Sequence, residues 1–210
     1  MHGILHFRSP FPFAGRRGDR RQPLGARRVS ASTCKTDPYA PKTWWACAAL
    51  LPHAQAALSV GSDGMGRVAN SAGASGSYAA ARELWRTIAD ARAQTLGPEH
   101  PATLNARAEV ASWTGMAGDA ARARDQFAAL LPVDERVLGP EHPDTLTACH
   151  NLARWTGEAG DAAGACDLYA ALLPVKERVL GPEHPDTRDT RVNLAYWAGK
   201  ANSSTTPTTD

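Results

Sequence analysis

The sequence predicts an all-α fold in which pairs of helices stack into a solenoid, with disordered tails at both ends. Three observations support this prediction. A 42-residue unit recurs, since Leu96–Val137 and Leu138–Val179 are identical at 29 of 42 positions without a gap. Aromatic residues make up only 7% of the chain and alanine is abundant, which favours closely packed helices over sheets. Each unit also contains two stretches with the apolar periodicity of a helix.

The first helix of each unit, called helix A, follows a Leu-Gly-Pro-Glu-His-Pro loop. The last proline of the loop suits the first helical position, where the missing N–H costs nothing. These prolines are Pro101, Pro143 and Pro185. Helix A is expected to end near a glycine, which is Gly115, Gly157 or Gly199.

The second helix, helix B, is predicted from an apolar stripe. In the first full unit the stripe has the spacing i, i+4, i+7, i+8 typical of a buried helix face. It consists of Ala123, Phe127, Leu130 and Leu131, and it recurs as Ala165, Tyr169, Leu172 and Leu173. Glycines at 97, 139 and 181 are expected to stop each helix B. Pro132 and Pro174 lie inside helix B, where a lost hydrogen bond predicts a kink or a break.

These patterns divide the chain into seven segments. We expect a disordered basic leader (1–36), an N-terminal helix (37–60), a degenerate repeat (61–95), two full repeats (96–137 and 138–179), a half repeat with helix A only (180–200) and a disordered tail (201–210). The leader carries eight basic residues and one acidic residue, 8 − 1 = +7, against a net charge of +2 for the whole chain. Contact with nucleic acid or a cleaved targeting segment remain alternatives for the leader.

The recurring residues resemble the tetratricopeptide repeat in its 42-residue, kinesin-light-chain-like form, which also occurs C-terminally in bacterial NB-ARC-type signalling ATPases. The matching residues are Asn151-Leu152-Ala153, Gly160-Asp161, Ala165, Tyr169 and Leu172, followed by Leu-Gly-Pro-Glu-His-Pro-Asp-Thr. The resemblance implies a right-handed solenoid whose A helices line a concave groove for peptides or partner helices. The sequence departs from the family at positions 113, 155 and 197, where tryptophan stands in place of a more usual aliphatic residue.

The resemblance also implies which residues line the groove. Light-chain-type repeats use a helix A asparagine to hold a peptide backbone, and this residue matches Asn151 and Asn193, with Glu109 at the equivalent position of the first full repeat. The two asparagines are expected to be open to water. Helix A spacing adds further residues to the same face: Ser112, His150, Arg154, Tyr196 and Lys200. The alternative is that all of these are simply solvated polar positions.

No pattern in the sequence predicts an enzyme, a metal site or a cofactor. Cys149 and His150 are neighbours on a predicted helix and therefore point in different directions. The Glu-His pairs at 99–100, 141–142 and 183–184 are too far apart in stacked repeats to share a zinc ion. Residues 64–69 fit the G-x-G-x-x-A pattern, but the strand that this motif requires is not predicted before them.

The sequence thus predicts a non-catalytic module that binds a protein or a peptide. The alternative is a detached regulatory arm of an NB-ARC-type ATPase, although no P-loop motif is present in this chain. Four cysteines without a metal-type or paired spacing favour reduced thiols and a cytoplasmic location. The apolar run at residues 46–51 is too short for a membrane span.

Two expectations concern the tryptophans and the C-terminal end. The periodic tryptophans either stack neighbouring A helices on one another or form an aromatic ladder that faces a ligand. The half repeat lacks a helix B, so Leu194 and Trp197 are expected to be uncovered. Exposed apolar surface of this kind predicts self-association through the C-terminal helix.

Overall fold

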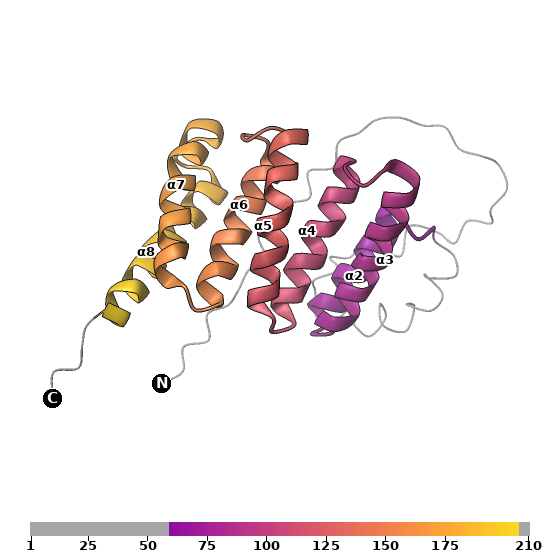
Figure 1. The fold of residues 1–210 in the computed structure, drawn as a ribbon, viewed down its shortest axis with the longest axis horizontal. Coiled ribbons are helices and arrows are strands. Elements are labelled where there is room, and N and C mark those ends of the chain that lie inside the picture. Colours follow the sequence, from indigo (N-terminus) through magenta and orange to yellow (C-terminus); the bar gives the residue numbers. More distant parts are fainter. Residues whose placement is uncertain (1–58, 206–210) are drawn as a thin grey trace. The chain divides into compact units, whose positions relative to one another are not determined.

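The computed structural model describes residues 59–205, and these residues form seven α-helices and no strand (Figure 1). The helices are α2 (Asp63–Ala74), α3 (Tyr78–Leu96), α4 (Pro101–Met116), α5 (Ala120–Val137), α6 (Pro143–Glu158), α7 (Ala162–Leu180) and α8 (Pro185–Thr205). The all-α prediction is confirmed. The predicted leader (1–36) and residues 37–58 of the predicted N-terminal helix lie outside the described residues. Within residues 59–205, no helix has the length and apolar character needed to cross a membrane.

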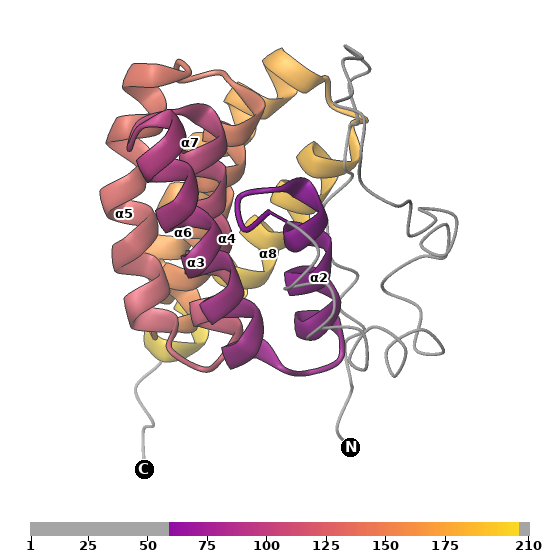
Figure 2. The same ribbon diagram turned by 90° about the vertical axis from the view of Figure 1, so that its right-hand side faces the viewer.

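The described helices stack in chain order. Each helix packs against the next, and contacts also join α4 to α6 and α6 to α8. The A helices are therefore α2, α4, α6 and α8, and the B helices are α3, α5 and α7. Figure 2 shows this stack from the α2–α3 end. The result is the predicted solenoid of helix pairs.

The recurring loop before each helix A has a structural role. The histidine is the N-cap, because its Nδ1 accepts the backbone N–H two residues later, at 3.1 Å for His100 and 3.2 Å for His142 and His184. The glutamate holds the loop against helix B of the same repeat, since Glu99 accepts from Arg136 near the end of α5 and Glu141 accepts from Arg178 near the end of α7. The loop therefore recurs because it starts helix A and contacts the end of helix B of its own repeat.

The predicted helix ends agree with the structure in the body of the stack and differ at its C-terminal end. Gly97, Gly139 and Gly181 have φ of 101°, 100° and 92°, the left-handed region in which glycine is favoured. Helix α8, however, continues to Thr205, five residues beyond the predicted end at 200. The equivalent helices α4 and α6 end before Gly118 and Gly160, whose φ values are 100° and 102°. Position 202, which is equivalent to these two glycines, is asparagine, and α8 continues through it.

The prolines inside the B helices do not break them. Helix α5 runs unbroken through Pro132, and α7 runs unbroken through Pro174, so the alternative of a break is wrong. Both prolines lie on the water side of the stack, and Ala128 and Ala170 one turn earlier are exposed. Proline has no N–H, so the carbonyl groups one turn earlier lose their helical hydrogen bonds. Because these carbonyls lie on the water side, they can bind water instead, and this reduces the free-energy cost of a proline inside the helix.

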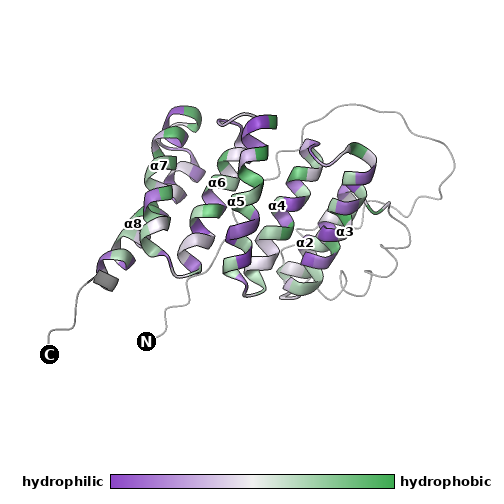
Figure 3. Ribbon diagram, viewed as in Figure 1, coloured by the Kyte–Doolittle hydropathy of each residue, from purple (hydrophilic) through white to green (hydrophobic). Residues whose placement is uncertain are grey.

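The core is divided among the junctions of the stack. Each of three clusters centres on one aromatic residue of a B helix, Trp85, Phe127 or Tyr169, with small alanines around it. Figure 3 shows apolar and polar residues alternating along the helices, as expected of amphipathic helices packed on one side.

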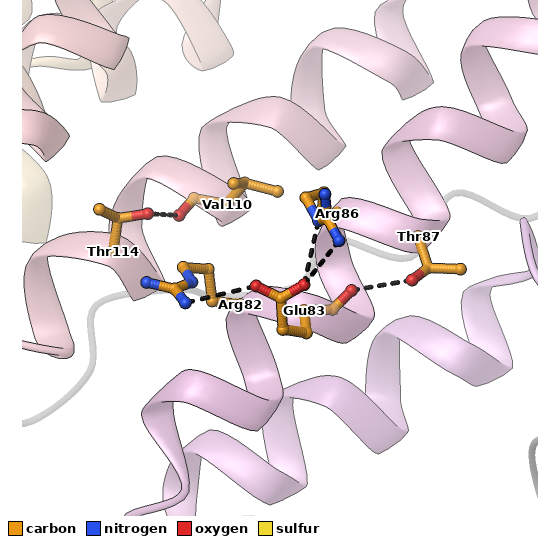
Figure 4. A network of polar contacts seen from close by, with 6 residues as sticks. All are labelled: Arg82, Glu83, Arg86, Thr87, Val110 and Thr114. Atoms are coloured by element: carbon orange, nitrogen blue, oxygen red, sulfur yellow. Dashed lines mark hydrogen bonds and ion pairs between the residues drawn. The ribbon is translucent and has the colours of Figure 1, made fainter.

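Figure 4 shows a group of polar contacts on α3 and α4 that each stay within one helix. Glu83 accepts hydrogen bonds from Arg82 at 3.3 Å and from Arg86 at 3.0 Å, and Thr114 donates to the carbonyl of Val110 at 2.7 Å (Figure 4). Exposed ion pairs of this kind contribute little to stability. The helices are therefore held together mainly by apolar packing.

Candidate functional site

Successive A helices are joined by a glycine–tryptophan contact. The ring of Trp113 lies on Gly73, the ring of Trp155 on Gly115, and the ring of Trp197 on Gly157. A methyl group added at Gly115 or Gly157 would lie 2.5 Å from the facing ring. Trp155 and Trp197 are 4% and 6% exposed. Of the two interpretations of the periodic tryptophans, the structure shows the one in which they stack A helices on one another.

This contact overturns the expectation for Trp197. The ring was expected to be uncovered because no helix B follows α8, but α6 covers it through Gly157. Leu194 is half-buried against the cluster around Tyr169. The large apolar residues that α8 exposes are instead Val192, at 68%, and Tyr196, at 46%.

The contact predicts opposite effects for one substitution at two equivalent glycines. Gly157→Ala is expected to destabilise the protein by about 1–3 kcal/mol, because the new methyl group displaces Trp197. Gly199→Ala is expected to stabilise it by up to about 1 kcal/mol, because nothing lies within 4 Å of the new methyl group and alanine favours helix. Urea unfolding of both variants at low protein concentration measures the two changes. A Gly157→Ala variant at least as stable as the wild type would show that the close approach of Gly157 and Trp197 does not constrain this site.

The predicted groove residues lie on the A helices, at positions that recur every repeat. Glu109, Asn151 and Asn193 are equivalent, but their surroundings differ. Asn151 is 9% exposed, so the expectation that it is open to water is wrong, and a ligand can reach it only through this small surface. Asn193 is half-buried, and its Nδ2 donates to the carbonyl of Asp189 at 2.8 Å. Its side-chain oxygen keeps its capacity to accept.

His150 is directed into the packing between helices rather than toward open surface. Its ring stands edge-on to the ring of Tyr169 in α7, with 5.1 Å between the two ring centres. Its Nδ1 lies 3.3 Å from the hydroxyl of Thr190 in α8. Burial lowers the pKa of His150 to about 3, and the charges of Lys176 and Arg154 act in the same direction. The side chain is therefore neutral near pH 7 and packs against α7 and α8, while its place in the groove stays a prediction.

Four other side chains of the A helices form a more accessible group, which we call the A-helix surface: Met116, Arg154, Tyr196 and Lys200. The guanidinium carbon of Arg154 lies 4.4 Å from the ring centre of Trp155, and its Nη2 lies 3.7 Å from the sulfur of Met116. Lys200 places its Nζ 5.7 Å from the ring centre of Tyr196. Ser112, at the position equivalent to Arg154 and Tyr196, is half-buried. The surface combines apolar area with two cations.

Glu109 differs from the asparagines in its ionisation. Burial raises the pKa of Glu109 to about 7, and the neighbouring Trp113 indole opposes this shift only in part. Near neutral pH the side chain is a mixture of carboxylic acid and carboxylate. Position 109 therefore offers a ligand a different group from the amides at 151 and 193.

The remaining sequence candidates have packing or capping roles. Burial raises the pKa of the Cys149 thiol to about 11, so it is not an activated nucleophile. Residues 64–69 lie inside α2, where Gly66 packs on Trp85, rather than in a strand-to-helix turn. Among the residues that the structure describes, no group of three His, Cys, Asp or Glu side chains is placed to hold a metal ion.

Sequence reasoning missed three features of this region: the glycine–tryptophan contact, the exposure of Val192, and the part played by Met116. The glycines at 73, 115, 157 and 199 recur at the repeat length, and so do the tryptophans. That signal was present, but a glycine near a helix end more often indicates a stop than a packing surface.

Comparison with known proteins agrees with the fold. A family model described as a tetratricopeptide repeat matches residues 65–102, 103–144 and 145–186. Two crystal structures of a candidate kinesin light chain with nearly identical TPR-like repeats from Podosopora anserina, one of them of a point variant, are similar. Each is 23% identical, with TM-scores of 0.61 for the variant and 0.60 for the other, over 78% of this chain and 79% of that one.

A third solved structure, BtubC (BKLC) from P. vanneervenii, is 17% identical with a TM-score of 0.60, over 77% of this chain and 66% of that one. At these identities the likeness shows the fold alone. No curated protein matches the chain.

Proposed function

The chain belongs to the tetratricopeptide repeat family, whose fold is generally a non-catalytic protein–protein interaction module, and from this premise we propose that its A helices bind a peptide or a helix of a partner protein. The observation that supports the proposal is the A-helix surface, in which Arg154 of α6 contacts Met116 of α4, and Lys200 lies over the ring of Tyr196 on α8. A cytoplasmic location and reduced thiols are part of the proposal.

The chemistry of the A-helix surface suggests the kind of ligand. Met116 is adaptable and apolar, and Tyr196 presents an aromatic face, so together they suit an apolar side chain of the ligand. Arg154 and Lys200 are cations; burial lowers the pKa of Arg154, but a guanidinium stays charged in proteins. A peptide with an apolar residue followed or preceded by an acidic one fits this combination.

Asn193 is the proposed contact to the ligand backbone. Its amide donates to the Asp189 carbonyl, and this bond orients the side-chain oxygen for a backbone N–H of the ligand. Asn151, which is nearly buried, is expected to contribute less than Asn193. The proposal therefore predicts that Asn193 contributes more to ligand binding than Asn151 does.

The proposal predicts that binding depends on Arg154 far more than on an equally charged residue of a B helix. Peptides selected on the full chain from a displayed library are titrated against the wild type, Arg154→Glu, and the control Arg124→Glu on α5. Arg154→Glu is expected to weaken binding at least tenfold, whereas the control leaves it within about twofold, since reversal of one close charge is worth about 1.4 kcal/mol or more. Circular dichroism verifies that all three are folded.

Equal affinities of the wild type and Arg154→Glu would contradict the proposal. The same titration with Asn151→Ala and Asn193→Ala tests the order of the asparagines, with the larger loss expected for Asn193. If the natural partner proves to be a separate P-loop ATPase chain, the module is a regulatory arm of that ATPase. That result would identify the partner, and the A-helix surface would remain the proposed binding surface.

A further inference from the structure

Helix α8 exposes an apolar stripe that its equivalents in the stack bury. The stripe consists of Val192, Ala195 and Gly199, which lie on one helix face at i, i+3 and i+7, and all three are exposed. Nothing lies within 4 Å of a methyl group added at Gly199. We call these three residues the α8 stripe.

In α6 the equivalent positions are His150, Ala153 and Gly157, and the next helices cover them. Ala153 is fully buried in the cluster that contains Ala165 and Tyr169 of α7, and His150 packs on the ring of Tyr169. The covering element is therefore a helix B, together with the helix A that follows it. Whatever covers the α8 stripe should have the shape and apolar face of a helix B.

The chain itself departs from the repeat where this helix B should begin. In α6 the turn at Gly160 leads directly into α7, whereas α8 continues as helix through residue 202. In the part of the chain that the structure describes, no segment doubles back onto the α8 stripe.

A sequence of the helix B type occurs elsewhere, at residues 41–58. The pentapeptide Ala-Ala-Leu-Leu-Pro of α5 (128–132) and α7 (170–174) recurs at 48–52, and Leu58 then matches Leu138 and Leu180. In α5 and α7 this pentapeptide supplies Leu130 and Leu172, which are buried. The preceding residues, 1–36, carry no helix A motif. Residues 41–58 thus resemble a helix B in sequence, and α8 is a helix A that no helix B covers among the described residues.

We propose that residues 41–58 of one copy pack on the α8 stripe of a second copy, as α7 packs on α6, so that the chains associate head to tail. Both surfaces are apolar: the only residues of the segment with ionisable side chains besides Cys47 are Lys42 and His53. Each copy has one such segment and one α8 stripe, and the two surfaces are different. The contact is therefore heterologous, and association is open-ended rather than limited to a dimer.

Sedimentation velocity on full-length variants tests whether the contact joins the segment of one copy to the α8 stripe of another. Val192→Glu blocks the α8 stripe, and Leu51→Glu blocks the segment, since Leu51 matches Leu131, which packs on the cluster around Phe127. Leu96→Glu, an exposed leucine at the end of α3, is the matched control. The wild type and the control are expected to form assemblies that grow with concentration. Each blocked variant alone is expected to sediment as one chain of 22.3 kDa.

An equimolar mixture of the two blocked variants decides the question. In the mixture, the Val192→Glu chain keeps an intact segment and the Leu51→Glu chain keeps an intact α8 stripe. One chain of each kind can therefore associate, and the mixture is expected to form a dimer of about twice the single-chain mass and nothing larger. A Leu51→Glu variant that still associates alone would overturn the proposal in favour of an α8–α8 contact. A wild type that stays a single chain at all concentrations would also overturn it.

A milder variant guards against misfolding of the segment. Leu51→Ala shortens the same side chain without adding a charge, and it is expected to weaken the assembly at least tenfold while the circular dichroism spectrum stays that of the wild type. An unchanged assembly of Leu51→Ala, together with no dimer in the mixture, would refute a role for residues 41–58. Neither result depends on the peptide surface formed by Met116 and Arg154.

Discussion

Replacement of Trp155 by alanine is expected to lower the free energy of unfolding by about 3–5 kcal/mol, the range for removal of a large buried aromatic side chain. Trp155 lies on Gly115 of α4 and belongs to the same cluster as Phe127 of α5. The cavity would therefore open where α4, α5 and α6 meet. Urea unfolding of the full chain, followed by circular dichroism, measures the loss.

Trp155→Phe is the matched control for this prediction. It keeps a ring against Gly115 but removes the indole N–H, which is buried and has no hydrogen-bond partner among the described residues. Removal of an unsatisfied donor offsets part of the lost packing, so the expected cost is below about 1.5 kcal/mol. If phenylalanine and alanine proved equally destabilising, the ring would not be what joins α4 to α6.

Asp134→Asn is expected to raise the free energy of unfolding at pH 7 by about 1–3 kcal/mol. Asp134 is 3% exposed, and its Oδ1 has no hydrogen-bond partner among the described residues. Burial, together with the negative charge of Asp144, raises the pKa of Asp134 to about 6, while His142 opposes the shift. A buried, unpaired carboxylate is therefore a cost that the amide does not carry.

The pH dependence of the same variant follows from the direction of the shift. A carboxyl whose pKa is raised on folding stabilises the folded state when protonated, and this contribution is lost as the pH rises from its ordinary value of 3.8 through about 6. The advantage of Asp134→Asn over the wild type should therefore shrink from pH 7 to pH 4. The control Asp125→Asn, at an exposed residue of α5, should change stability by only a few tenths of a kcal/mol at either pH. A constant difference between Asp134→Asn and the wild type across this range would refute the assignment.

The charge at this position also varies from repeat to repeat. Arg92 and Lys176 occupy the equivalent buried positions in α3 and α7, so only the middle repeat has an acid there. Arg92 pairs with Asp63 at 3.0 Å, and the charges of Asp186 and Asp189 favour the ionised form of Lys176 against its burial. Asp134 instead has Asp144 as its neighbour. The repeat thus tolerates a buried ionisable residue at this position, and the sign of its charge determines how much its burial lowers the stability of the fold.

The helices could be predicted from the sequence because their signals are local. Proline and glycine mark the helix ends, and the stripe that includes Phe127 gives the buried face of α5. The B helices were expected to kink or break at Pro132 and Pro174, and they do not break there. That error arose because sequence spacing does not show that the affected carbonyls lie on the water side.

The candidate site was less predictable because it depends on contacts between repeats. Asn151 and His150 lie on the predicted helix, yet the neighbouring helices bury Asn151 and hold the ring of His150 against Tyr169. Trp197 has no helix B beside it in sequence, but Gly157 of the previous A helix receives it. Which residues face a neighbour depends on the distance between A helices, and a periodic pattern alone does not contain that distance.

The glycine–tryptophan contact also bears on how such a chain can lengthen. Its two residues belong to successive units: Gly115 precedes Trp155, and Gly157 precedes Trp197. An in-frame duplication of one 42-residue unit therefore supplies a new tryptophan for the old glycine and a new glycine for the next unit. No further substitution is needed for the added helix pair to pack. The 29 identical positions of 42 shared by residues 96–137 and 138–179 are what copying of such a unit, followed by divergence, would leave in a gene.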